Sequence, residues 1–255
     1  MAEAAMRLPA RFYRSAPLDQ RGHVEIALEI PTSSAALVLC DVYGTGFDEG
    51  AARPEQPPLM SSWDIWELQR TMMQDVLAPL TRAWRSAGLA VVYVENRYPD
   101  LAWEGGRFAS WWRDSTGFNV SEVIGRPGRQ WEYSQLIEPQ PDDYLITKAQ
   151  DDAFCDTSLD LLLRNLRVRH LVMAGFAAEC CLLSTIQGAY QRGYETVLVR
   201  DACLADEHHD TEAGLQLTNW AIRVVESSRG PSAVAADVVS ALATRAEQWR
   251  QQPML

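Results

Sequence analysis

Short apolar runs alternate with helical segments along most of this 255-residue chain. The runs have the length of buried strands, whereas the segments between them repeat apolar residues at helical spacing. Such alternation predicts parallel strands joined by crossover helices, so we expect an α/β protein, a three-layer α/β/α sandwich with a mostly parallel, six-stranded sheet. The expected strands are 35–41, 90–96, 143–147, 169–174, 195–200 and 221–226, and the expected helices are 62–87, 156–167, 180–192, 207–219 and 232–248.

The regions outside this alternation suggest the domain organisation. We expect a single domain over residues 31–250. Residues 1–30, in which prolines and arginines recur, are expected to form an arm that lies over this domain or over a neighbouring subunit. Two long irregular stretches, 44–61 and 97–130, leave carboxyl ends of strands and should overhang any site there. The second stretch holds three tryptophans that could contact substrate or lie in a subunit interface: Trp103, Trp111 and Trp112. It also holds four arginines: Arg107, Arg113, Arg126 and Arg129.

Charge and cysteine content narrow the class of protein. The formal net charge is −11, and no basic stretch compensates for it, which argues against partners such as nucleic acid or an anionic membrane. No apolar run approaches the length of a membrane span, and the N-terminus has no signal-peptide core. The five cysteines are an odd number and several lie in apolar runs, so we expect a reduced, cytoplasmic setting rather than disulfides.

Three expected strands are followed by complementary reactive groups. One apolar run stops at Asp41, a second stops at Lys148, and a third leads through a glycine to Cys181 at the start of a helix. The carboxyl ends of parallel strands share one edge, where ligands of such sheets bind. A thiol at a helix N-terminus faces unpaired N–H groups and the positive end of the helix dipole, which favour the thiolate.

A single buried cysteine is more often a packing residue than a nucleophile. An acid, an amine and a thiol at three strand ends together predict an active site. Adjacent helical residues point about 100° apart, so only one of Cys180 and Cys181 can face the other two groups.

These residues resemble the isochorismatase-like cysteine hydrolases, whose members have an Asp–Lys–Cys triad. Gln130-Trp-Glu-Tyr133 and Glu95-Asn96 look most like the ureidoacrylate amidohydrolase branch of that family. The motifs that carry the resemblance are Ala36-Leu-Val-Leu-Cys-Asp41, Asp143-Tyr-Leu-Ile-Thr-Lys148, and Ala174-Gly175 through Cys181 to Ser184-Thr185.

The resemblance implies a role for each member of the triad. Asp41 would take the thiol proton, Lys148 would stabilise the charges, and Cys181 would attack a carbonyl carbon. Backbone N–H groups of Ala177 and Cys181 would form the oxyanion hole, aimed by a cis Phe176–Ala177 peptide bond. The residues expected to contact substrate are Tyr43, Asn96, Tyr133, Phe154 and Phe176.

The expected function is cysteine-dependent hydrolysis of a C–N bond in a small non-peptide amide or ureido/carbamoyl compound through a thioester. One alternative is an isochorismatase-type vinyl-ether hydrolase, which protonates its substrate from the aspartate and does not need the thiol. Another is a catalytically silent binding protein of the same fold. The expected partners are a small-molecule substrate and further copies of the chain in a dimer or tetramer.

Metal binding is not expected. Some relatives, the nicotinamidases, hold a divalent ion on an Asp-x-His…His cluster after the first helix, but none of the four histidines here lies between Asp41 and Gly88. His208 and His209 are adjacent, whereas ligands on one helix face need a spacing of three or four residues. We therefore predict neither metal nor cofactor.

The flanks of the lysine motif depart from the family pattern. Relatives often carry an Arg-Tyr-Ser-Ala-Phe-like run there, and this chain has Gln150-Asp151-Asp152-Ala153-Phe154. The loss of a basic residue and the gain of two acids disfavour an anionic substrate through like-charge repulsion. Arginines of the 97–130 stretch could still supply positive charge, so the sequence leaves the charge of the substrate open.

Overall fold

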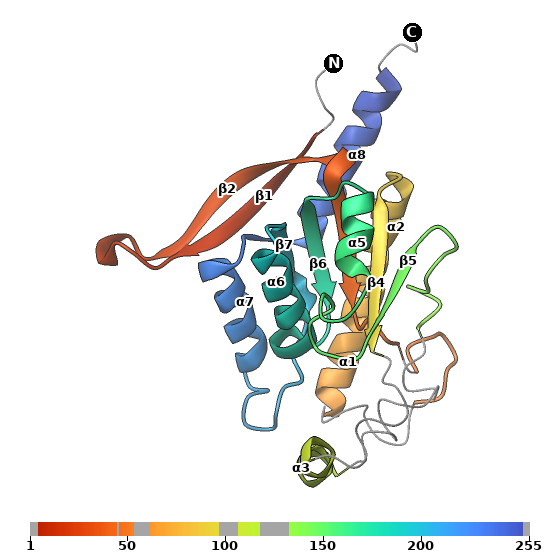
Figure 1. The fold of residues 1–255 in the computed structure, drawn as a ribbon, viewed down its shortest axis with the longest axis vertical. Helices are drawn as coiled ribbons and strands as arrows, with labels where there is room; N and C mark the ends of the chain where they lie inside the picture. Colours follow the sequence, from red (N-terminus) through yellow and green to blue (C-terminus); the bar gives the residue numbers. More distant parts are fainter. Residues whose placement is uncertain (1–4, 45, 54–61, 97–106, 118–132, 252–255) are drawn as a thin grey trace.

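The computed structural model describes residues 5–44, 46–53, 62–96, 107–117 and 133–251, which are arranged in three layers around one sheet (Figure 1). The predicted α/β class and the mostly parallel sheet are confirmed. The strand order is β2-β1-β8-β7-β6-β3-β4-β5, and β3 to β8 run parallel. The strands are β1 (Ala5–Arg14), β2 (Gly22–Pro31), β3 (Ala35–Cys40), β4 (Ala90–Asn96), β5 (Tyr144–Lys148), β6 (His170–Gly175), β7 (Glu195–Cys203) and β8 (Ser232–Ala233).

Helices cover both faces of the sheet. Helices α5 (Leu159–Asn165), α6 (Leu183–Gln191) and α7 (Gln216–Ser228) lie in front of it in Figure 1, and α1 (Trp63–Met72), α2 (Ala78–Ser86) and α8 (Ala235–Gln251) pack on the other face. All six residues of β3 are buried. Leu37 and Leu39 join the core under α2 and α8, whereas Val38 and Cys40 join the core under α5 and α6. A strand buried on both faces explains the continuous apolar run in the sequence.

Four predicted helices are confirmed to within a few residues. The first is continuous from Trp63 to Ser86, with a π-helical turn between α1 and α2, and the Ser62 hydroxyl accepts a hydrogen bond from the Ile65 N–H (3.2 Å) at its start. The helix predicted at 180–192 begins at Ala178 with a second π-helical turn before it continues as α6.

The strand predicted at 221–226 is wrong, because this segment lies inside α7. Its buried residues Ala221, Ile222 and Val225 are spaced as on one helix face. The run of β-branched side chains favours a strand locally, but packing of that face against the sheet decides the outcome.

The helix predicted at 207–219 begins only at Gln216. Glu207 is fully buried, and its carboxylate accepts hydrogen bonds from the N–H groups of Leu217 (3.1 Å) and Thr218 (2.8 Å). These are two of the donors that a helix N-terminus leaves unpaired, so Glu207 stabilises the start of α7 from outside the helix.

The predicted N-terminal arm is a β-hairpin that extends the sheet, which therefore has eight strands rather than six. β1 and β2 pair antiparallel along their whole length, and β1 joins β8 at Arg11 and Ser232. The hairpin is anchored by buried Glu226, which accepts from Arg11 Nε (2.8 Å) and lies 2.9 Å from His23 Nε2. Figure 1 shows its turn lying away from the helical layers.

No helix in the described ranges combines the length and the hydropathy that a membrane span requires.

The end of β6 approaches β3 too closely for any side chain. Gly175 has φ +116°, and a Cβ built there would lie 2.1 Å from the carbonyl oxygen of Cys40. The N–H of Phe176 donates to that same oxygen (2.7 Å). Glycine therefore lets the chain leave β6 directly beside the end of β3.

We expect Gly175→Ala to lower the free energy of unfolding by about 3 kcal/mol, because both the backbone and Cys40 must shift. Gly193→Ala is the matched control, since Gly193 also has positive φ (+81°) but open space around it, and it should cost about 1 kcal/mol. Urea unfolding measures both. Equal losses would show that the contact with Cys40 is unimportant.

Candidate active site

The three reactive groups predicted from the sequence lie at the carboxyl ends of β6, β3 and β5, and Asn96 lies at the end of β4; these four strands are neighbours in the order β6-β3-β4-β5. Cys40 pairs with Gly175 across β3 and β6, and Asn96 pairs with Lys148 across β4 and β5. The chain continues from β3 to β4 on one side and reaches β6 on the other. In open α/β sheets, ligands usually bind beside such a reversal of strand order, outside the carboxyl ends of the strands.

A buried ion pair occupies the centre of this edge. Lys148 Nζ lies 2.9 Å from Asp41 Oδ2, and both side chains are almost inaccessible to solvent. The other carboxylate oxygen, Oδ1, accepts from the Tyr43 hydroxyl (2.9 Å) and from the Asn96 N–H (3.1 Å). Asp41 itself adopts a left-handed backbone conformation (φ +48°), which is uncommon for a residue other than glycine. Each oxygen of this buried carboxylate thus has donors that replace water.

Lys148 is the only lysine in the sequence. Burial would by itself lower the pKa of its ammonium group, but the neighbouring Asp41, Cys40 and Cys181 side chains favour the charged form, and together they raise that pKa well above its usual range. The surrounding side chains therefore stabilise Lys148 in its charged form.

Asn96 connects the ion pair to Cys181. Its Oδ1 accepts from Lys148 Nζ at 2.5 Å, and its Nδ2 lies 4.0 Å from Cys181 Sγ. Because an ammonium group can only donate, the amide oxygen must face Lys148, and the NH₂ group must face the sulfur. The ion pair thus fixes the direction of a donor that points at the thiol.

Cys181 is buried in the π-helical turn Ala178–Leu182, directly after β6. The pKa of its thiol is raised well above the usual value by the contact with Cys180, by burial and by the Asp41 charge, and Lys148 only partly opposes them. This direction is opposite to the prediction that the setting favours the thiolate. The Lys148 charge does not outweigh the contact with Cys180, burial and the Asp41 carboxylate. A neutral thiol needs a base before it can attack a carbonyl carbon.

The backbone before the nucleophile has the expected form. The Phe176–Ala177 peptide bond is cis. The N–H groups of Cys180 and Leu182 both donate to the carbonyl oxygen of Ala177 (3.1 Å each). Among the described residues, no backbone acceptor outside the helix takes the N–H of Ala177 or of Cys181, which leaves this pair available to an oxyanion.

The remaining residues predicted to contact substrate occupy different places. Tyr43 is buried and holds Asp41. The Tyr133 hydroxyl donates to the Glu95 carboxylate (3.1 Å), and the Tyr133 ring packs against the ring of Tyr43. Phe154 and Phe176 lie in the two apolar cores, one on each face of the sheet. The structure therefore brings Tyr43 and Asn96 to the triad and places the other three around it.

The segment after β5 adds a contact that the sequence does not predict. Asp151 Oδ1 lies 3.9 Å from Cys181 Sγ. Buried Thr185 holds this segment, because its hydroxyl donates to the Asp151 carbonyl (3.3 Å) and accepts from the Ala153 N–H (3.1 Å). A threonine four residues after Cys181, on the same helix face, is the signal that could have indicated a contact there.

Asp151, Cys180 and Cys181 also have ligand atoms within 4.8 Å of one another and could hold a metal ion. The predicted absence of a metal stays a prediction. His23 and His170 lie far from this group along the sheet, beside Glu226 and Ser34 respectively.

The two irregular stretches are only partly described. Residues 107–116 of the second stretch form helix α3, on which Trp111 is 62% exposed, whereas Trp103, Arg126 and Arg129 and the side chains of Arg107 and Trp112 lie outside the described residues. Arg113 lies beside Asp114 on the same helix.

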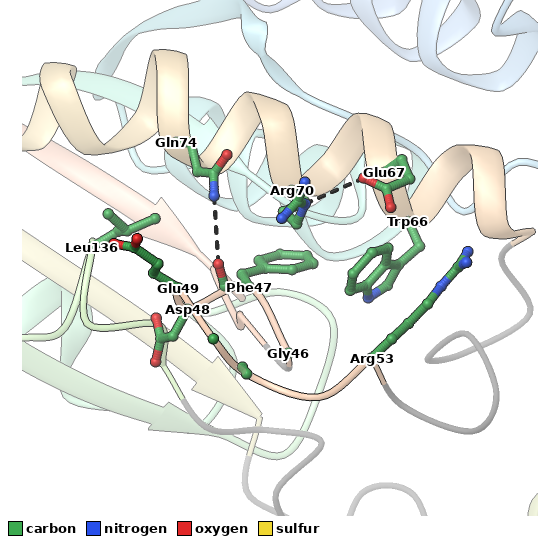
Figure 2. Close-up of a pocket in the computed structure, with 12 residues that line it drawn as sticks. Gly46, Phe47, Asp48, Glu49, Arg53, Trp66, Glu67, Arg70, Gln74 and Leu136 are labelled. Atoms are coloured by element: carbon green, nitrogen blue, oxygen red, sulfur yellow. Dashed lines mark hydrogen bonds and ion pairs between the residues drawn. The ribbon is translucent and has the colours of Figure 1, made fainter.

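The described part of the first stretch packs against α1 and encloses a hollow of about 590 Å³ (Figure 2). Phe47 and Trp66 line it with their rings tilted against each other (5.4 Å between centroids), and Arg53 and Arg70 line it as well. No member of the triad lines this hollow, so we place the candidate site at the sheet edge.

Comparisons with known proteins identify the family and the fold. The family model described as the isochorismatase domain matches residues 66–229. The ureidoacrylate amidohydrolase RutB of Yersinia enterocolitica is 26% identical over 184 residues, which cover 69% of this chain and 77% of that protein. The RutB of Variovorax paradoxus is 29% identical over 185 residues, 69% of this chain and 70% of that protein.

A solved structure of a cysteine hydrolase from Pseudomonas syringae pv. phaseolicola 1448A has the same fold. Its TM-score is 0.70 at 19% identity, and the match covers 91% of this chain and all of that one.

The two charges beside Cys181 should change its reactivity in opposite directions. Lys148→Met removes the cation that lowers the thiol pKa, and Asp41→Asn removes an anion that raises it. At pH 7 we expect alkylation of Cys181 by iodoacetamide to become about tenfold slower in the first variant and about tenfold faster in the second, since each unit of pKa changes the thiolate fraction tenfold. Mass mapping of the modified peptide measures the rates.

Lys148→Met leaves a buried carboxylate unpaired, so thermal unfolding must show that the variant is folded. The double variant Asp41→Asn/Lys148→Met removes both charges and should return to near the parental rate. Rates that shift in the same direction in both single variants would contradict the electrostatic account of the site.

Proposed function

We propose that this chain, which belongs to the isochorismatase family, hydrolyses a C–N bond of a small non-peptide amide or ureido/carbamoyl compound. The observation that carries the proposal is the buried Asp41–Lys148 pair, which Asn96 connects to the Cys181 thiol. The similarity to the ureidoacrylate amidohydrolases supports amide chemistry. The same edge of the sheet supplies an acid–base group, a nucleophile and candidate oxyanion donors.

The first half of the reaction forms a thioester. Cys181 Sγ attacks the substrate carbonyl while its proton passes to Asp41, because a neutral thiol is a weak nucleophile. The carbonyl oxygen becomes an oxyanion that the N–H groups of Ala177 and Cys181 stabilise, and one such donor typically contributes about 3 kcal/mol. The tetrahedral intermediate collapses with loss of ammonia or an amine, which leaves with the proton held by Asp41.

The second half regenerates the thiol. Asp41, again a carboxylate, takes a proton from water as the water oxygen attacks the thioester carbonyl. Collapse of the second intermediate releases the acid and returns the proton to Cys181. Lys148 stays charged throughout and keeps Asp41 in place, so it acts by position and charge rather than by proton transfer.

The proposal is tested with a panel of small amides, carbamoyl compounds and ureas, scored by ammonia release. We expect Cys181→Ala to lower kcat at least about 10³-fold on any substrate found, because no other group forms the thioester. Cys180→Ala is the matched control. It removes the neighbouring thiol of the same turn, and we expect it to retain most of the activity.

Other outcomes would replace the proposal. Full activity of Cys181→Ala together with loss in Asp41→Asn would indicate vinyl-ether chemistry, in which the thiol is not needed. Loss in Cys180→Ala alone would assign the nucleophile to Cys180. Inhibition by EDTA that Zn²⁺ reverses would show that the Asp151–Cys180–Cys181 group holds a metal. Failure of every compound, with no covalent intermediate detectable by mass, would favour a binding protein.

A further inference from the structure

We propose that Asp151 determines substrate charge, and that the substrate carries a protonated amine or guanidinium group close to the carbonyl that Cys181 attacks. This inference rests on the proposed function for its reaction, and on the charges around Cys181 for the substrate class.

Asp151 is placed to meet whatever binds beside the nucleophile. Its side chain is exposed, and its Oδ1 lies 3.9 Å from Cys181 Sγ. Within the described part of the chain, no cationic side chain lies within ion-pair distance of Asp151. The carboxylate therefore keeps its full charge for a ligand, and a positive group that approaches Cys181 gains an ion pair.

The position of Asp151 is fixed by other residues. Thr185, on the helix that carries Cys181, holds the Asp151 carbonyl and the Ala153 N–H. The nucleophile and the carboxylate are thus connected through one helix and one short segment. A preset position favours selectivity, because little order is lost when a ligand binds.

The charges around the thiol are predominantly negative. Lys148 is the one cation that the described contacts place there, and Asp41 already neutralises it. Glu179 lies two residues before Cys181, and its carboxylate accepts from the Asp206 N–H (3.3 Å). Burial raises the pKa of Asp206 to about 7, and the nearby carboxylates of Glu179 and Asp41 add to the shift.

Asp152, the adjacent acid, has a different role. Its Oδ1 accepts from the Phe154 N–H (2.8 Å), and its Oδ2 lies 4.0 Å from Arg192 Nη1. The carboxylate also packs against Gly188, where a Cβ would lie 2.3 Å from it. Asp152 therefore stabilises the turn and is already compensated. The two acids are adjacent in the sequence but have different contacts: Asp151 lies beside Cys181, and Asp152 stabilises the turn that follows it.

The test uses two thiol reagents of opposite charge, which report the field at Cys181 whether or not a substrate is known. These are the trimethylammonium-ethyl and the sulfonatoethyl methanethiosulfonates, and each leaves a mixed disulfide on the cysteine. The rate of each with Cys181 is divided by its rate with 2-mercaptoethanol, and the ratio of the two results is the charge preference. The peptide mass separates Cys181 from the half-buried Cys155, and fragmentation of the labelled peptide by tandem mass spectrometry separates Cys181 from the adjacent, half-buried Cys180.

We expect the parent protein to prefer the cationic reagent. Asp151→Asn should lower that preference about tenfold. In a largely aqueous setting, a carboxylate about 4 Å away should speed the reaction of the cationic reagent about threefold to fivefold and slow that of the anionic reagent by a similar factor, and the two factors multiply in the ratio. Asp152→Asn, the matched control, should leave the preference within about twofold of the parent. Asp151→Lys should favour the anionic reagent.

Three outcomes would overturn the inference: a parent that prefers the anionic reagent, equal effects of Asp151→Asn and Asp152→Asn, or no change in Asp151→Lys. Failure of the proposed function would appear differently, as an absence of hydrolysis in the amide panel with the charge preference intact. If the panel yields a cationic substrate, Asp151→Asn should raise its KM about fivefold or more and change kcat little.

Discussion

The ion pair between Lys148 and Asp41 holds the candidate site together. Two opposite charges can remain inside a protein only when each compensates the other and the remaining donors and acceptors are satisfied. Here the ammonium group also donates to Asn96, and the carboxylate also accepts from Tyr43 and from the Asn96 backbone. Removal of either charge therefore affects more than one contact at the edge of the sheet.

The two charges also act on the Cys181 thiol, in opposite directions. A thiol beside a lysine and a helix terminus is expected to ionise, yet the contact with Cys180, burial and the Asp41 charge raise the pKa of Cys181 and favour the neutral thiol. A neutral thiol next to a carboxylate is suited to a reaction in which the proton moves only as the sulfur attacks. A neutral thiol is also less prone to side reactions, because the thiolate is the reactive form.

The sequence predicts the cluster of Asp41, Lys148 and Cys181 better than it predicts the N-terminal strands β1 and β2. Asp41, Lys148 and Cys181 each follow a strongly apolar strand, and parallel topology alone brings such ends together. The N-terminal strands carry weaker signals, because Pro9 and alternating charged residues interrupt them. Their place on the sheet involves contacts between residues far apart in the sequence, such as the pairing of Arg11 in β1 with Ser232 in β8 and the ion pair of Arg11 with Glu226 in α7, 215 positions away.

Two further features depend on three-dimensional packing rather than on local pattern. The segment 221–226 reads as a strand, but its buried face packs as a helix. The acids at 151 and 152 look equivalent in the sequence, and only the structure shows that Asp151 contacts Cys181 whereas Asp152 caps its own turn. Small differences of direction between neighbouring residues decide such roles, and sequence spacing does not fix them outside regular helices and strands.

The ionisation of Lys148 tests the central claim most directly, because the chain has no other lysine. Protein labelled with [¹⁵N]lysine should give a single Nζ resonance, which can be followed by NMR as the pH is raised. The account predicts that Lys148 in the parent protein stays protonated beyond about pH 11, above the ordinary lysine pKa. In Asp41→Asn, where burial is no longer opposed by the carboxylate, its pKa should fall markedly. A parent resonance that titrates at or below about pH 10.4 while the protein is still folded would contradict the account.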